Sequence, residues 1–329
     1  MKAILMRRVG DPFVLEYAEV PTPHPGDNEV LIKAHTIGVG VPEVLVRKGV
    51  YEWMPPLPFI PGIEMSGTVA ELGRNVQCLT AGQPVFISAR DLPVRAGCYA
   101  EYIAVPADAA HPLPANCDLE AAACLSNYQV AYHLLHTAAR GVEVHSVVVH
   151  MAGGGVGSAA VDLARLTKMT VIAVVGSEAQ SQAVTAMGAH HVVRYQMDVA
   201  TRVCEATGGR GADLILDSIG GKNFGDNFKM VARMGMVISY GFREGWPNPN
   251  LVAAMRSNFD ASPALRFFTM HSFDRRPDIR KATMKILLAY LAAGNLHPLI
   301  YDRLPLAKAC RAHELLESGK VIGKLVLKP

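Results

Sequence analysis

The clearest chemical signal in the sequence is a glycine-rich turn. In the stretch VVVHMAGGGVGSAAVDLARL, an apolar run leads into glycines and then into a helical pattern with small residues in its first turn. Residues 152–157 form AxGxxG, a variant of the GxGxxG dinucleotide fingerprint. Glycine is needed because the turn is tight, the backbone must approach a pyrophosphate and the helix must pack closely on the strand. The free N–H groups at the helix start would then face the phosphates.

The residues after the next strand bear on which nicotinamide cofactor is used. An acidic residue at that strand end would bind the ribose 2′-hydroxyl of NAD, but residues 173–177 are AVVGS and the first carboxylate is Glu178. This pattern permits NADP. Ser177 could donate to a 2′-phosphate, and Arg194 and Tyr195 end the following strand, where side chains reach the adenosine end. An ordinary solvated surface arginine is the alternative interpretation of Arg194.

The elements that must position this turn alternate regularly along the chain. Apolar strands are predicted at 146–150, 170–175, 191–193, 212–217 and 236–241, with helices at 156–168, 178–187, 198–207, 223–230 and 277–293. Such alternation is typical of a parallel sheet. Residues 1 to about 110 are instead rich in Pro and Gly with short β-branched runs at 29–34, 67–70 and 84–88, which predict a mainly β domain. The final KVIGKLVLKP predicts a strand that returns to it.

Composition limits the classes of function. A chain of 329 residues, half of them hydrophobic, predicts two domains, and a net charge of +3 gives no reason to expect nucleic-acid or anionic-membrane partners. No apolar stretch approaches the roughly 20 residues of a membrane span. The N-terminus indicates a first strand rather than a signal peptide, so we expect a cytoplasmic protein. The six cysteines form no CxxC pair, which argues against disulfides and zinc.

Motifs spread over the whole chain extend this interpretation. They include MKAI, EVPTPHPGDNEVLIK, PFIPGIEMSGTVAELG, GCYAEYIAVPAD, GGRGADLILDSIGG and AHELLESGKVIGKLVLKP. With the glycine turn, they resemble the zeta-crystallin-type quinone oxidoreductases, the zinc-free branch of the medium-chain dehydrogenase/reductases. The resemblance implies an α/β protein in which a Rossmann doubly wound parallel sheet (121–264) is inserted into a GroES-like mainly β domain (1–120 plus 265–329). It also implies a homodimer paired through an edge strand.

The resemblance further implies a set of residues that bind NADP(H). The pyrophosphate would be held by Gly154, Gly155, Val156 and Gly157, the 2′-phosphate by Gly176, Ser177 and Tyr195, and the nicotinamide side by Ser239, Tyr240, Gly241 and Phe242, with Phe268 and Thr269 from the next strand. The lysine that relatives often have just past Ser177 is Gln180 here, which leaves Arg194 as the available cation. Asn127 could supply a further polar group, although a helix-capping role is the simpler interpretation.

No metal is expected. Zinc-dependent relatives place a cysteine ligand where this chain has residues 41–43 and a GHE triplet where it has Gly62, Ile63 and Glu64. The four-cysteine structural lobe is missing as well, because residues 88–97 contain no cysteine. His133 and His136 lie one helical turn apart, but two histidines in an apolar helix are more often packed or at the surface.

Without a metal, hydride transfer depends on positioning the cofactor and polarising the acceptor. Tyr51 matches the substrate-side tyrosine of the family, and its phenol could hydrogen-bond a developing oxyanion; an aromatic lid is the alternative. The chain departs from the family pattern at three positions: Gly40 replaces an asparagine in the substrate pocket, Val130 a threonine near the nicotinamide, and Gln180 the lysine past Ser177. The resemblance leads us to expect reduction of a quinone or similar activated carbonyl compound. The departures leave an enone or enoyl-thioester reductase as the alternative. A dinucleotide-binding sensor or structural protein with little turnover is a third hypothesis.

Overall fold

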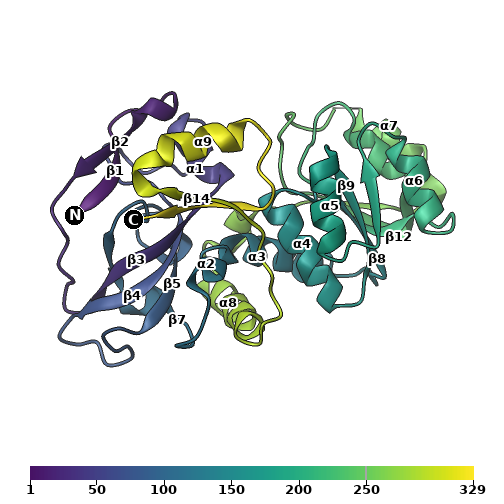
Figure 1. Cartoon of the computed structure of the whole chain (residues 1–329). Coiled ribbons are helices and arrows are strands. Elements are labelled where there is room, and N and C mark those ends of the chain that lie inside the picture. The colour runs from purple at the N-terminus through teal and green to yellow at the C-terminus, as the bar shows by residue number, and fades with distance from the viewer. Residues whose placement is uncertain (249) are drawn as a thin grey trace. The chain divides into compact units, whose positions relative to one another are not determined.

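The computed structural model describes residues 1–248 and 250–329. Its contacts divide the chain into two compact units, one formed by Met1–Ser126 with Met284–Pro329 and the other by Asn127–Thr283. Figure 1 shows the purple N-terminal and yellow C-terminal segments together in the first unit. The sequence prediction placed the second division at 264/265. The strand β13 (Ala264–Phe267) crosses that division, yet it pairs with β12 (Val231–Ser239) and so belongs to the sheet of the second unit.

The first unit is a mainly β domain of the GroES-like type. Its seven-stranded sheet has the order β14-β15-β3-β4-β5-β7, with β6 also paired to β3. The bounds are β14 Ile300–Pro305, β15 Lys324–Lys328, β3 Glu29–Val39, β4 Glu64–Leu72, β5 Pro84–Ser88, β6 Tyr102–Pro106 and β7 Ala110–Pro112. A separate pair joins β1 (Lys2–Met6) to β2 (Leu15–Glu19). The antiparallel pairing of β15 with β3 confirms that the final strand returns to the N-terminal domain.

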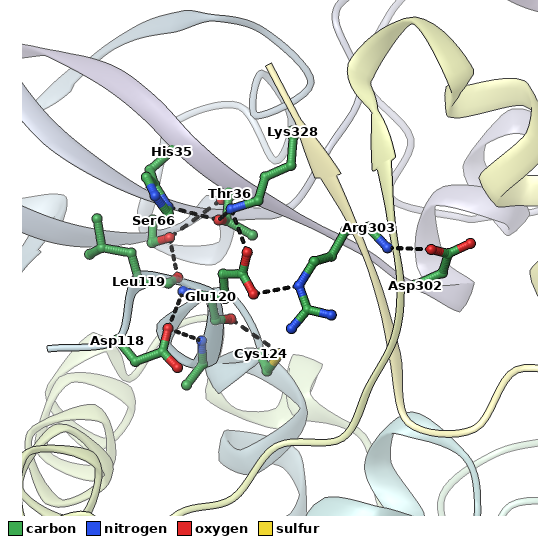
Figure 2. A network of polar contacts seen from close by, with 11 residues as sticks. His35, Thr36, Ser66, Asp118, Leu119, Glu120, Cys124, Asp302, Arg303 and Lys328 are labelled. Carbon is green, nitrogen blue, oxygen red and sulfur yellow. Dashed lines mark hydrogen bonds and ion pairs between the residues drawn. The ribbon is translucent and has the colours of Figure 1, made fainter.

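A polar network fastens the C-terminal strands to the short helix α2 (Leu119–Ala122), as Figure 2 shows. The carboxylate of Glu120 accepts from Arg303 Nε on β14 (2.6 Å) and pairs with Lys328 Nζ at the end of β15 (2.7 Å). Lys328 also donates to Thr36 on β3 (2.8 Å). Asp118 caps α2 by accepting from the backbone N–H of Glu120 at 2.8 Å. The network therefore joins segments that lie about two hundred residues apart in the chain.

The second unit is a Rossmann domain. Its six strands are all parallel in the order β10-β9-β8-β11-β12-β13, the doubly wound arrangement 3-2-1-4-5-6. The strands not yet given are β8 Ser146–His150, β9 Thr170–Val175, β10 His191–Arg194 and β11 Ala212–Asp217. β8 buries every residue, as expected for the central strand of a sheet covered on both faces, and this explains its continuous apolar sequence.

Four of the five predicted helices are present as α-helices, and further helices lie outside the predicted ranges. Their bounds are α1 Val41–Arg47, α3 Leu125–Tyr132, α4 Gly155–Leu166, α5 Glu178–Ala186, α6 Val199–Ala206, α7 Leu251–Arg256, α8 Pro277–Ala292 and α9 Ala309–Glu317. The helix expected at 223–230 is a 3-10 helix, Phe224–Lys229, and β12 begins at Val231 rather than 236. The backbone of β12 is irregular at Met234, whose φ is 57°. The first residues of this strand therefore do not show the sequence pattern of a regular strand. Among the described residues, no helix is long and apolar enough to cross a membrane.

Candidate cofactor site

The glycine turn joins β8 to α4 at the carboxyl end of the central strand. The turn begins at Met151, whose φ is 51°, and the Met151 carbonyl accepts from the N–H of Gly154 at 2.8 Å. A Cβ at Gly157 would lie 2.2 Å from that same carbonyl oxygen, so only glycine fits. Gly154 is the N-cap of α4 and provides no side chain to its first-turn N–H groups. Those groups, beginning at Gly155, have no acceptor within the helix, which is the arrangement that binds a pyrophosphate.

Gln180 holds the ends of two neighbouring strands together, a role that the sequence did not indicate. Its Oε1 accepts from the N–H of Gly176 at 2.9 Å. A Cβ at Gly153 would lie 2.8 Å from Cγ of the same side chain. Ser177 caps α5 and accepts from the Gln180 N–H at 3.3 Å. The glutamine that stands in place of a family lysine therefore lies across the turns after β8 and β9.

The residues expected near a 2′-phosphate lie on adjacent strands. Arg194, the last residue of β10, pairs with Val175, the last residue of β9, so Ser177 follows at the same edge of the sheet. The Arg194 side chain is 43% exposed and its Nη1 lies 3.4 Å from the Glu178 carboxylate. The charge of Arg194 is thus shared with an acidic neighbour, and its role toward a phosphate stays a prediction.

Tyr195, the residue that follows β10, contacts the glycine turn. Its hydroxyl oxygen accepts from the N–H of Met151 at 2.8 Å and lies 3.2 Å from Nδ1 of His150. The His150 and Tyr195 rings also stack, with centroids 5.9 Å apart. Burial raises the pKa of the Tyr195 phenol, although the bond from Met151 lowers it. The hydroxyl that was predicted to bind a 2′-phosphate is therefore already engaged in two contacts.

The residues expected on the nicotinamide side follow β12. Ser239 is fully buried, and among the described residues its hydroxyl has no hydrogen-bond partner. The N–H of Tyr240 donates to the Asp217 carbonyl at 2.9 Å, and burial raises the pKa of the Tyr240 phenol to about 12. A Cβ at Gly241 would lie 2.9 Å from the carbonyl oxygen of Ser218. These contacts hold the turn after β12 against the turn after β11.

Three aromatic rings lie just beyond this turn. Phe242 is 37% exposed and stacks on Trp246 with centroids 4.0 Å apart, and Phe267 lies 6.4 Å from Phe242. Trp246 is 71% exposed. Phe242 and Trp246 follow β12, and Phe267 is the last residue of β13. The three rings therefore lie at the carboxyl edge of the sheet, where open parallel sheets bind ligands.

The other residues expected at the site are less closely joined to it. The N–H of Phe268 donates to the Ser239 carbonyl at 2.8 Å, whereas Thr269 is exposed and caps the next turn by accepting from His271 at 3.3 Å. Asn127 is half-buried on α3. Their roles in cofactor binding stay predictions.

Tyr51 lies in the first unit, in the segment after α1. Its ring is partly buried against the core of that unit and meets Trp53 edge-on, with centroids 5.6 Å apart. The arrangement suits both roles that the sequence left open, an oxyanion donor and an aromatic lid.

A buried charged cluster lies beside Gly38 and Gly40, two positions that the family resemblance predicts to line the substrate pocket. Glu64 pairs with Lys324 through one oxygen and accepts from the N–H of Ser126 at 3.0 Å through the other. Glu43, only 2% exposed, has one carboxylate oxygen with no hydrogen-bond partner among the described residues. Burial raises the pKa of Glu43 to about 7 even though Lys324 lowers it. A Cβ at Gly40 would lie 3.1 Å from that unpartnered oxygen.

The two helical histidines are packed among aromatic rings. His133 lies 4.5 Å from the Phe273 ring and 3.0 Å from the Thr137 hydroxyl, and burial lowers its pKa to about 4. The His136 ring lies 4.5 Å from that of Tyr132. In the part of the chain that the structure describes, no three His, Cys, Asp or Glu side chains are grouped to hold a metal ion.

Two protein-family models match this chain, and together they cover parts of both units. Residues 26–115 match the alcohol dehydrogenase GroES-like domain, and residues 187–327 match the family described as zinc-binding dehydrogenase. The quinone oxidoreductase of Rattus norvegicus is 31% identical over 332 residues, which cover 99% of this chain and 97% of that protein. The chain belongs to the quinone oxidoreductase family of the medium-chain dehydrogenase/reductases.

The names of similar proteins and of similar solved structures describe different activities. The synaptic vesicle membrane protein VAT-1 homolog of Homo sapiens is 28% identical, covering 97% of this chain and 84% of that protein. Among solved structures, an NAD-dependent alcohol dehydrogenase has a TM-score of 0.89 at 31% identity, and the Escherichia coli quinone oxidoreductase complexed with NADPH has 0.85 at 26%; each comparison covers 100% of both chains. A 2-haloacrylate reductase has 0.81 at 28%, covering 100% of this chain and 99% of that one.

Proposed function

We propose that the chain is a metal-free reductase that uses NADPH to reduce a quinone or a similar activated carbonyl compound. The observation that carries the proposal is the turn of residues 151–157, in which only glycine fits at Gly157 and the start of α4 presents backbone N–H groups. Ser177 and Arg194 at one edge of the sheet, with no acidic residue at the end of β9, favour the phosphorylated cofactor. The NADPH complex of the related E. coli enzyme supports the same choice.

When bound, NADPH would supply the hydride for the acceptor and leave as NADP⁺, and the proton would come from water. The first-turn N–H groups of α4 would hold the pyrophosphate. The turn of Ser239–Phe242 would support the nicotinamide, and Tyr51 would hydrogen-bond the oxygen of the acceptor as it gains charge. Metal-free transfer is supported by Ile63, which stands where zinc-dependent relatives have histidine, and by Glu64, whose two oxygens are occupied by Lys324 and Ser126.

Cofactor titration and an acceptor panel test the proposal. Fluorescence titration should show tighter binding of NADPH than of NADH, and equal or inverted preference would contradict the cofactor assignment. NADPH oxidation should be fastest with 1,4-benzoquinone, compared with an enone and an enoyl thioester, and should survive dialysis against a chelator. Tyr51→Phe should lower kcat by about a hundredfold if the phenol is an oxyanion donor. An unchanged kcat would assign Tyr51 to the lid instead.

Two alternatives are outcomes of the same panel. Preferential reduction of the enone or enoyl thioester would make the protein a reductase of conjugated double bonds, an alternative supported by the related 2-haloacrylate reductase. NADPH binding with no consumption for any acceptor would indicate a sensor or structural protein. That alternative is supported by the replacement of pocket polar groups by Gly40 and Val130, and by the VAT-1 relative, whose name describes no reaction.

We also propose a homodimer that pairs through β13. β13 is an edge strand of the six-stranded sheet, so its outer backbone groups can pair with a second copy. Light scattering of dilute protein should give twice the chain mass, and a monomer would contradict the interface. A cytoplasmic location remains part of the proposal, to be tested by cell fractionation.

A further inference from the structure

A chain of hydrogen bonds runs behind the glycine turn, across the carboxyl ends of three parallel strands. Asp217, at the end of β11, accepts from the N–H groups of Ile219 (2.8 Å) and Gly220 (2.9 Å) through one oxygen. Its other oxygen accepts from Asn227 Nδ2 at 2.9 Å. Asn227 Oδ1 lies 3.0 Å from Nε2 of His150, the last residue of β8. Asp217, Asn227 and His150 are all buried, so these contacts are shielded from water.

The donors and acceptors of this chain have one consistent direction. Because the Asn227 amide nitrogen donates to a carboxylate, its oxygen faces His150, and His150 must donate from Nε2. Burial lowers the pKa of His150, although Asp217 and the bond with Asn227 raise it, and a neutral ring leaves Nδ1 as an acceptor. The Tyr195 hydroxyl then donates to His150 Nδ1 (3.2 Å) while its oxygen accepts from the N–H of Met151 (2.8 Å).

We propose that these four side chains, His150, Tyr195, Asn227 and Asp217, form a hydrogen-bonded network, here called the relay, that fixes the conformation of the pyrophosphate-binding turn. The inference rests on the proposed function, because it assumes that this turn binds a dinucleotide.

The relay ends at Met151, and the conformation of the glycine turn depends on this residue. Met151 has the positive φ that starts the turn, and its carbonyl both accepts from Gly154 and contacts the Cβ position of Gly157. Holding the Met151 N–H therefore orients the peptides that present the α4 N-terminus. Tyr195 and His150 are positioning residues for the pyrophosphate, and the relay extends their support to the turn after β11.

The relay and the 2′-phosphate contact predicted for Tyr195 give different results with the two cofactors. The pyrophosphate is common to NADH and NADPH, whereas the 2′-phosphate is present in NADPH alone. In Tyr195→Phe the ring remains, but the Met151 N–H and His150 Nδ1 lose their partner. We expect the affinities for both cofactors to fall by the same factor, about tenfold, which is the effect of one lost buried hydrogen-bond partner. The ratio of the two dissociation constants should stay unchanged.

The experiment is fluorescence titration of both cofactors against wild type, Tyr195→Phe, Asn227→Leu and the double variant. Asn227→Leu breaks the relay at a distance from the turn, so it should lower both affinities too. The double variant should cost less than the product of the single effects, because both changes disable one network. Tyr17→Phe, at an exposed position in the first unit, is the matched control and should leave both affinities unchanged. Melting temperatures without cofactor establish that each variant is folded.

The other possible results of these titrations and of the acceptor panel bear separately on the relay and on the proposed function. Loss of NADPH affinity alone in Tyr195→Phe would make Tyr195 a 2′-phosphate ligand and overturn the relay. Unchanged affinities in both single variants would overturn it as well. A wild type that binds neither cofactor would overturn the proposed function and the relay together. Cofactor binding without turnover of any acceptor would remove the reductase and leave the relay supported by the titrations.

Discussion

Replacing Glu43 by glutamine should change how the stability of the first unit depends on pH. Glu43 is buried with Glu64 around a single lysine, Lys324, and one of its oxygens lacks a hydrogen-bond partner among the described residues. Cys98 and Tyr99 also face this cluster, and the ionised Glu43 raises the pKa of each, after the larger effect of burial. If Glu43 were ionised, its carboxylate and that of Glu64 would share one buried ammonium group, that of Lys324. Glutamine keeps the shape of the protonated acid and cannot ionise.

The magnitude follows from the pKa of Glu43, which burial raises from 4.5 to about 7. The folded protein therefore holds the proton more tightly than the unfolded chain. The stabilising contribution is fully present below pH 4.5 and is lost as the pH rises through about 7. At about 1.4 kcal/mol for each pH unit between the two pKa values, the loss reaches about 3 kcal/mol. Glu43→Gln should thus gain stability relative to wild type as the pH rises from about 5 to 9.

Urea unfolding monitored by tryptophan fluorescence measures this difference. The chain has two tryptophans, Trp53 in the first unit and Trp246 in the second, so a Trp246→Phe background leaves Trp53 to report on the first unit. Glu71→Gln, at the exposed end of β4, supplies the matched correction for losing one surface carboxylate. A difference between Glu43→Gln and its parent that stays constant from about pH 5 to 9 would refute the reasoning.

Three further predictions concern single residues. Gly157→Ala should abolish NADPH binding, because its Cβ would lie 2.2 Å from the Met151 carbonyl oxygen. Gly176→Ala is the comparison variant and should leave a folded protein, because the nearest atom to its Cβ lies at 3.5 Å. Fluorescence titration would measure cofactor binding, circular dichroism would measure folding, and equal behaviour of the two variants would contradict the prediction. Gln180→Lys should raise the preference for NADPH over NADH by about fivefold, since an exposed ion pair contributes up to about 1 kcal/mol; an unchanged ratio of dissociation constants would count against a 2′-phosphate at this edge. Asp213→Ala should lower the free energy of unfolding by about 2 kcal/mol in urea titrations, because one of its oxygens accepts three hydrogen bonds from residues 145 and 146; a loss below about 0.5 kcal/mol would contradict this.

Local chemistry made much of the second unit predictable. β8, β9 and β11 have the predicted bounds because buried parallel strands produce unbroken apolar runs, and the glycine turn is evident because its geometry excludes every other residue at Gly157. The start of β12 was missed because the irregularity around Met234 interrupts the pattern of a strand. The 3-10 geometry of Phe224–Lys229 was missed because its apolar pattern also fits an α-helix.

By itself, the sequence determined that the chain has two kinds of domain, where the dinucleotide turn lies, and that the final strand returns to the first domain. Each of these depends on residues that are neighbours in the chain or on a recognisable run. Only the tertiary structure decided the direction of side chains that meet from distant segments. Examples are Gln180 lying over Gly153, Tyr195 bound to Met151, and the cluster of Glu43, Glu64 and Lys324. Their roles depend on burial and on partners supplied by the fold, which no local pattern encodes.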